Sequence, residues 1–174
     1  MDASALSRAG LCAALIAGGA CTELSTGPDL SGVWQVTSYT AAGAGCGPGA
    51  DVGGLPYIEF SRETIAGQVF YQWARCTSAT ACEAANPLED LQYARAVVGG
   101  YAAAQYGGSG DATSCLLTAR VSTAVIGADG ALSIVTEEHR DQVTGSACDA
   151  PAAQSADDAM TLPCVAVTRI IAIR

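Results

Sequence analysis

Alternating apolar and polar residues predict that most of this chain forms β strands. In residues 30–40, Trp34 and Val36 fall on one face of such a strand and polar side chains fall on the other. Residues 57–62 and 68–75 alternate in the same way on either side of a short turn. Two alternating runs joined by a turn predict an antiparallel hairpin.

A longer hairpin is predicted for residues 115–140, with its turn at residues 127–130. Residues 164–174 are almost continuously apolar and β-branched, which predicts a strand buried on both faces. The glycine-rich stretch 41–54 predicts a loop, and residues 149–159 predict a short helical turn.

Residues 86–105 support two readings. Residues 86–89 carry a helix-start signature, an asparagine cap followed by proline and then by a glutamate that would complete a capping box. However, Gly99-Gly100 would cost a helix interior about 2 kcal/mol. Two short strands, 92–98 and 101–105, are therefore favoured over a helix. The whole pattern predicts a mainly β fold, an antiparallel barrel or half-barrel with one or two short helices.

The N-terminal stretch 11–21 predicts export. It is a short apolar run behind Arg8, too short to span a membrane, and it ends in small residues before Cys21. A cysteine in that place resembles the lipobox of bacterial lipoproteins, in which it carries diacylglycerol, although Gly18 stands where leucine is usual. Cleavage by an ordinary signal peptidase, giving a secreted protein, and a buried helix in a cytosolic protein are the alternatives.

The expected organisation is a lipoprotein signal peptide over residues 1–20, a flexible tether over 21–31 and an antiparallel β domain over 32–174. The chain has 17 acidic residues against 8 basic ones, all arginine, and a net charge of −9. This balance argues against nucleic acid as a partner, because phosphate binding needs clustered cations. The expected membrane contact is through the lipid on Cys21.

Six cysteines remain once Cys12 leaves with the signal and Cys21 carries lipid. An even number in an exported chain predicts three disulfides, each contributing about 2–4 kcal/mol. The six are Cys46, Cys76, Cys82, Cys115, Cys148 and Cys164.

The spacing of the cysteines predicts one pair best. Cys76 and Cys82 close a short loop and are expected to bond to each other. Cys46 would pin the glycine-rich loop. The expected remaining pairs are Cys46–Cys148 and Cys115–Cys164. No zinc-type spacing is present and His139 is the only histidine, so no metal site or cofactor is expected.

No residue is predicted to be catalytic. His139 lies in a charged strand end, where a solvated residue is a simpler interpretation than a general base. The chain has no G-x-S-x-G nucleophile elbow. Asp157-Asp158 matches no calcium loop and is expected to cap a helix.

Residues 30–34, LSGVW, resemble the G-x-W opening of lipocalin-like (calycin) barrels. In that family the tryptophan closes the barrel base beneath an arginine from the last strand. The resemblance implies that Arg169 would stack on Trp34 here. The lipobox-like start, spaced cysteines and closing strand together resemble uncharacterised cysteine-rich lipoproteins of bacterial envelopes, which implies no particular activity.

The expected function is that of an outer-membrane lipoprotein of the cell envelope, a structural or protein-binding surface module. The alternative is a lipocalin-like protein that binds a small apolar ligand, and a hydrolase built around His139 is more remote. An enclosed apolar cavity above ~300 Å³ would favour the ligand. The residues expected to close the barrel or face that ligand are Trp34, Tyr57, Tyr71, Trp73 and Arg169.

Overall fold

The computed structural model describes residues 27–83, 91–111, 113–145 and 147–174. The predicted signal peptide, the lipid-bearing Cys21 and the helix-start signature at 86–89 lie outside these residues. No helix within the described ranges is long and apolar enough to cross a membrane.

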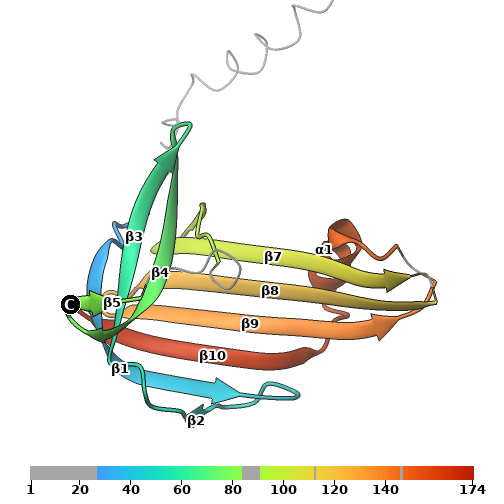
Figure 1. The fold of residues 1–174 in the computed structure, drawn as a ribbon, viewed down its shortest axis with the longest axis horizontal. Helices are drawn as coiled ribbons and strands as arrows, with labels where there is room; N and C mark the ends of the chain where they lie inside the picture. Colours follow the sequence, from blue (N-terminus) through green and yellow to red (C-terminus); the bar gives the residue numbers. More distant parts are fainter. Residues whose placement is uncertain (1–26, 84–90, 112, 146) are drawn as a thin grey trace, which may run out of the picture.

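The described residues form one antiparallel sheet of ten strands and a single helix (Figure 1). The order across the sheet is β5-β4-β3-β1-β10-β9-β8-β7-β6, with β2 paired to β1. The elements are β1 (Gly32–Ala42), β2 (Ala50–Asp51), β3 (Tyr57–Ile65), β4 (Gln68–Ser78), β5 (Ala81–Cys82), β6 (Arg95–Val97), β7 (Gly100–Asp111), β8 (Ser114–Ile126), β9 (Leu132–Val143), α1 (Ala150–Asp158) and β10 (Cys164–Ile173).

The sheet is curled but not closed. Strands β7 to β10 run side by side, and the β3–β4 hairpin rises steeply from one end of them (Figure 1). The two ends of the sheet meet at a single bridge, in which Tyr71 and Tyr93 exchange backbone hydrogen bonds of 3.0 and 2.8 Å. The predicted half-barrel is thus confirmed.

The predicted hairpins are also confirmed. β3 and β4 pair from Tyr57–Cys76 to Ile65–Gln68, and β8 and β9 pair from Cys115–Val143 to Ile126–Leu132. Strands β6 and β7 turn at Val98-Gly99, so the described part of 86–105 forms strands rather than a helix. Gly99 has a φ of +76°, which glycine adopts at little cost.

The concave side of the curl holds the main hydrophobic core. Phe60 meets Tyr93 edge to face, with ring centroids 5.8 Å apart. The Tyr93 hydroxyl lies 2.7 Å from the hydroxyl of Ser122, which in turn lies 2.8 Å from that of Thr136. These bonds satisfy polar groups that would otherwise be costly to bury. The largest fully buried side chains of this core are Trp34, Tyr93, Phe60, Leu30, Ile58, Leu132 and Ile134.

A second, smaller cluster lies on the convex side, where α1 packs on β7 and β8. Leu117 and Ala119 of β8 are buried against Ala153 of α1 and against Leu162. Asp149 caps the helix, because its side chain accepts a hydrogen bond of 2.9 Å from the Ala152 N–H. The predicted helical turn is confirmed, but Asp149 is the N-cap and Asp157-Asp158 forms the other end.

The prediction that the last strand is buried on both faces is wrong at its C-terminal end. Ile170 and Ala172 face the core, whereas Ile171 and Ile173 are 36% and 42% exposed. Because α1 packs on β7 and β8 rather than on β10, the convex side of β10 is left open near these two isoleucines.

The three disulfides are Cys46–Cys164, Cys76–Cys82 and Cys115–Cys148. The prediction is right for Cys76–Cys82 and wrong for Cys46–Cys148 and Cys115–Cys164. Strand β9 lies between β8 and β10, and Cys115 pairs with Val143 whereas Cys164 pairs with His139. Two strand spacings across the sheet and four residues along it put the two cysteines roughly 16 Å apart. That separation exceeds the reach of a disulfide.

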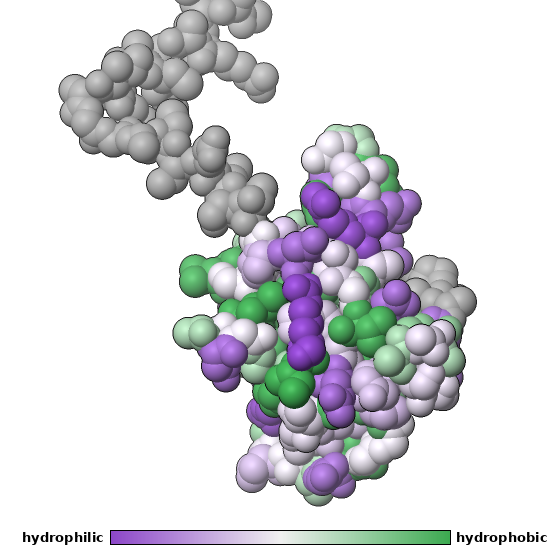
Figure 2. Space-filling model, turned by 90° about the vertical axis from the view of Figure 1, so that its left-hand side faces the viewer, coloured by the Kyte–Doolittle hydropathy of each residue, from purple (hydrophilic) through white to green (hydrophobic). Residues whose placement is uncertain are grey.

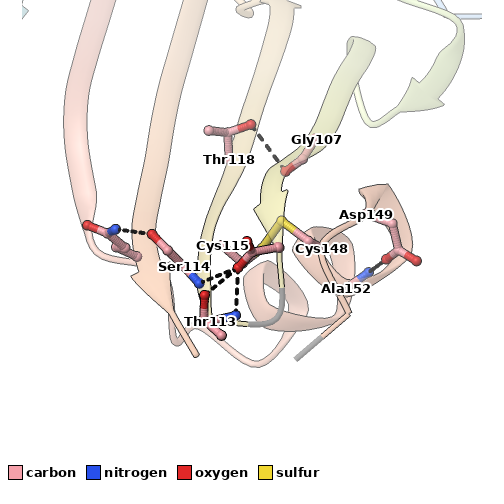
Figure 3. The surroundings of a disulfide bond; sticks show 10 residues. Gly107, Thr113, Ser114, Cys115, Thr118, Cys148, Asp149 and Ala152 are labelled. Carbon is pink, nitrogen blue, oxygen red and sulfur yellow. Dashed lines mark hydrogen bonds between the residues drawn. A yellow bond between two sulfur atoms is a disulfide. The ribbon is translucent and has the colours of Figure 1, made fainter. Parts of the chain in front are cut away.

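Each bridge instead joins neighbouring segments. The loop after β1 approaches the start of β10, where the Gly45 N–H donates to the Cys164 carbonyl at 3.1 Å. Cys148 leads into α1 and pins it to the start of β8 (Figure 3). Because disulfides persist in oxidising environments, the three bridges indicate an extracytoplasmic location.

Candidate functional site

Trp34 closes the end of the curl, and the arginine that covers it is Arg174. The Arg174 guanidinium carbon lies 4.3 Å from the centre of the Trp34 ring. The same guanidinium donates to the carbonyls of Asp29 and Ser31 at 3.0 and 2.9 Å. The indole N–H donates to the Leu30 carbonyl at 2.9 Å.

The prediction that Arg169 covers Trp34 is therefore wrong. Gln35 is paired with Ile173, so the register brings Arg174 opposite Trp34. Arg169 is paired with Thr40 and Val135, far along the strand from Trp34. Spacing within one strand could not show this offset, because it depends on pairing with another strand.

Two of the other expected lining residues do reach the interior. Tyr71 is buried, and its ring packs on Tyr101 with centroids 4.8 Å apart. Trp73 packs against the same core. Tyr57 alternates with the buried Ile58 and so faces the other side of the sheet.

The Tyr71 hydroxyl is hydrogen-bonded to Asp29 Oδ1 at 3.1 Å. Burial, followed by this bond to a carboxylate, raises the pKa of Tyr71 to about 12. Side-chain and backbone hydrogen bonds from Ser31, the largest contributions, lower the pKa of Asp29. Packed aromatic rings therefore occupy the part of the interior in which the lipocalin-like alternative would place a small apolar ligand.

Surface cavities flank strand β7 on both faces. On the convex face a cavity of about 520 Å³ lies between the sheet and the C-terminal end of α1. We call it the acidic cleft. Its charged and hydroxyl-bearing lining residues are Arg95, Tyr106, Ser122, Thr123, Glu137, Asp157 and Asp158.

His139 joins the sheet to the helix beside the acidic cleft. Its Nδ1 lies 2.6 Å from Asp157 Oδ1, and its Nε2 lies 3.8 Å from Glu137 Oε2. The interpretation of His139 as a solvated strand-end residue is wrong, since its side chain is 21% exposed and bonded across to α1. Both ring nitrogens lie against carboxylates, an arrangement that holds α1 in place.

The acidic cleft is negative at its centre. Burial, and then the charges of Asp157 and Asp158, raise the pKa of Tyr106. The two aspartates lie at the C-terminal end of α1, where the helix dipole disfavours negative charge, and no basic residue lies in its last turn. The contact with His139 accounts for Asp157, whereas helix stability does not explain the position of Asp158.

The concave face beside β7 has the opposite character. A cavity of about 370 Å³, which we call the arginine groove, is lined by Gln105, Thr118, Arg120, Glu138 and Arg140 together with neighbouring backbone. Arg120 Nε lies 3.6 Å from Glu138 Oε1. Two arginines and one glutamate make this groove locally positive on an acidic protein. Neither cavity is an enclosed apolar one.

The edge of β7 between these cavities is open. Strand β6 pairs only with Gly100–Ala102. Backbone groups of Ala102 point away from β8, as the bond from the Ala94 N–H to the Ala102 carbonyl shows. The N–H and C=O groups of successive residues point to opposite sides of a strand, so the groups of Ala104, Tyr106 and Gly108 point to the same edge as those of Ala102. No backbone partner for these groups is found within the described residues.

Sequence reasoning missed both the acidic cleft and this edge. Alternation shows which residues share a face, but not which strand is at the edge of a sheet. The one signal that could have indicated the edge is the glycine-rich run at 107–110, which is unusual inside a strand.

One group of potential metal ligands occurs among the described residues, formed by Glu59, Cys76 and Cys82. The two sulfurs are bonded to each other, so they offer no thiolate. No protein family, curated protein or solved structure matches this chain.

Proposed function

We propose that this chain is an exported, lipid-anchored protein of the outer membrane that acts as a structural or protein-binding module of the cell envelope. The observation that carries the proposal is the set of three disulfides within a curled sheet whose concave side holds a buried aromatic and aliphatic core. Bridges form outside the reducing cytoplasm. The buried core on the concave side favours a surface role over enclosure of a small apolar ligand.

The lipid would be on Cys21, and the polar residues that follow would separate the sheet from the membrane. Two acyl chains give a stable anchor where one is marginal. With this attachment, what the module offers to partners is its outer surface. The coloured projection at the upper right of Figure 2 is the end of the β3–β4 hairpin; its tip is white to green, hydrophilic residues lie just below the tip, and hydrophobic patches lie lower on the same face.

Intact-mass measurement of the full chain made in an exporting bacterial host tests the proposal. We expect a diacyl adduct on Cys21 and, on reduction, a gain of two hydrogens for each of the three bridges. The Cys21→Ser variant should lose the adduct and leave the membrane fraction, while it keeps all three bridges. A native chain in the cytosol with every thiol free to react would overturn the proposal.

A further inference from the structure

The Cys148–Asp149 backbone lies against Gly108, but from Ala104 to Tyr106 strand β7 lacks the features that ordinarily protect a sheet edge. Natural proteins cover such edges or place lysine, proline or a bulge on them. Residues 104–111 contain neither lysine nor proline, and their pairing with β8 is continuous, without a bulge. Ala104 and Gln105 are exposed, and this part of β7 forms the upper border of the long strands in Figure 1. A further strand could therefore hydrogen-bond to this edge.

Cavities lie on both faces of this edge. Tyr106 lines the acidic cleft on the convex face and borders the arginine groove on the concave face. Gln105 lines the arginine groove and also a smaller cavity of about 270 Å³ beside Phe70 and Leu91. Side chains of an added strand would alternate between these faces. In strand addition, backbone bonds supply affinity and pockets for alternate side chains supply specificity.

We propose that the Ala104–Tyr106 edge of β7 binds an extended peptide segment of a partner protein as an added strand, with a lysine or arginine of that peptide in the acidic cleft. This rests on the protein-binding role proposed above and names the partner class. Glu137, Asp157 and Asp158 line the cleft with one arginine, Arg95. His139 contacts Asp157 and Glu137 from beside the cleft, and Asp158 has no such contact with it, so the three carboxylates still favour a cationic side chain. The net charge of −9 favours the same partner.

The dimensions are compatible with this arrangement. An added strand would lie about 4.8 Å from β7. A residue opposite Ala104 on the convex face would need a long side chain to reach the cleft over that small alanine. Lysine and arginine have such side chains, with an apolar stem that can lie along the sheet.

The experiment measures binding of short acetylated peptides to the oxidised full chain by fluorescence anisotropy. One peptide alternates threonine and valine around a central arginine, and its partner has glutamate at the centre. We expect the arginine peptide to bind at least about tenfold more tightly, because that ratio corresponds to about 1.4 kcal/mol, near the lower end of the coupling measured for close charge pairs at interfaces. Equal binding of the two peptides would overturn the choice of a cationic partner.

Methylated peptides test the backbone bonds without altering the protein. In two versions of the arginine peptide, alternate amide nitrogens are N-methylated, on one edge or on the other. An added strand bonds to β7 through one edge only, so one version should bind and the other should not. Equal affinities of the two versions would overturn strand addition.

Variants of the protein locate the site. Ala104→Pro removes an N–H that points away from β8 and should abolish binding, whereas Ala104→Val keeps the N–H and should bind. The double variant Asp158→Asn with Glu137→Gln should weaken binding of the arginine peptide but not of the glutamate peptide. Glu63→Gln, on the exposed end of the β3–β4 hairpin, is the matched control and should leave binding of both peptides unchanged. Binding that is unchanged by Ala104→Pro would place the peptide elsewhere and overturn the proposal.

Sedimentation of the protein alone separates a second copy from a peptide partner. Dimerisation that Ala104→Pro abolishes, with no peptide binding to the monomer, would assign the edge to a second copy and overturn the peptide proposal. Because lipid attachment and bridges are measured separately, failure of peptide binding would leave the proposed envelope role standing.

Discussion

Tyr71 and Tyr93 exchange two backbone hydrogen bonds, and through them the two ends of the ten-stranded sheet meet. The same two residues belong to the core, where Tyr71 packs on Tyr101 and Tyr93 on Phe60. One pair of residues thus takes part both in the bridge between the ends of the sheet and in the packing of its interior.

Replacing Tyr93 by phenylalanine should destabilise the fold by about 0.5–1.5 kcal/mol, the net contribution of one buried hydrogen bond, because Ser122 keeps its bonds to Thr136 and to the Val135 carbonyl. The lost hydroxyl is bonded to Ser122 at 2.7 Å. Urea denaturation followed by circular dichroism measures the change. Tyr57→Phe, on the opposite face of the sheet, should change stability by less than about 0.5 kcal/mol. Equal effects of the two variants would contradict a stabilising role for the hydroxyl network.

Removing Arg174 should cost about 1–2 kcal/mol, because the contact with Trp34 and two hydrogen bonds to backbone carbonyls are lost. Trp34→Ala should cost about 3–5 kcal/mol, as for other large buried side chains. Arg169→Ala is the control and should have little effect. A larger loss of stability in Arg169→Ala than in Arg174→Ala would show that the wrong arginine has been assigned to the end of the curl.

The three disulfides should contribute unequally. Cys46–Cys164, Cys115–Cys148 and Cys76–Cys82 close loops of 118, 33 and 6 residues. Loop-closure entropy predicts contributions of about 5, 4 and 2 kcal/mol in that order. Paired Cys→Ser replacements, one bridge at a time, measure them by thermal and urea unfolding. Greatest sensitivity to loss of Cys76–Cys82 would contradict the ranking.

Stability should fall at alkaline pH, in part through Tyr71. Its pKa is raised to about 12, above the ordinary value of 10 in the unfolded chain. The folded state therefore holds this proton more tightly, and the resulting stability is complete below pH 10 and is lost as pH rises towards 12. Tyr71→Phe should make the fall between pH 10 and 12 shallower.

Burial also raises the pKa of Tyr93, so part of the alkaline fall should persist in Tyr71→Phe. Unfolding measured at a series of pH values, with a spectrophotometric titration of the tyrosines, gives both the slope and the ionisations. A slope that is identical in the wild type and in Tyr71→Phe would exclude a contribution from Tyr71.

The strands were largely predictable from the sequence, because burial of one face imposes alternation. The β8–β9 hairpin follows from alternating residues around a glycine-bounded turn, and Gly99 marks the turn before β7. The pairing of distant strands was not predictable. Irregularities in register, one between Val36 and Ser38 of β1 and one between Cys164 and Ala166 of β10, shift partners without any mark in the pattern.

The same limit explains the errors at particular residues. Arg174 rather than Arg169 covers Trp34 because of the register between β1 and β10. The bond between His139 and Asp157 depends on the path by which the chain returns from β9 to α1, and spacing does not encode that path. The Cys76–Cys82 bond was predictable because the two cysteines are only six residues apart in the sequence, which keeps them close to each other in any fold.

The pairing of β1 with β10 has a consequence for how the protein is made. Thr37 and Ile171 lie 134 residues apart, yet their strands are neighbours at the middle of the sheet. During synthesis or translocation the early cysteines emerge long before Cys164, so Cys46 first meets Cys76 and Cys82, neither of which is its native partner. We therefore expect maturation to wait for the last strand and to depend on enzymes that reshuffle mispaired sulfurs.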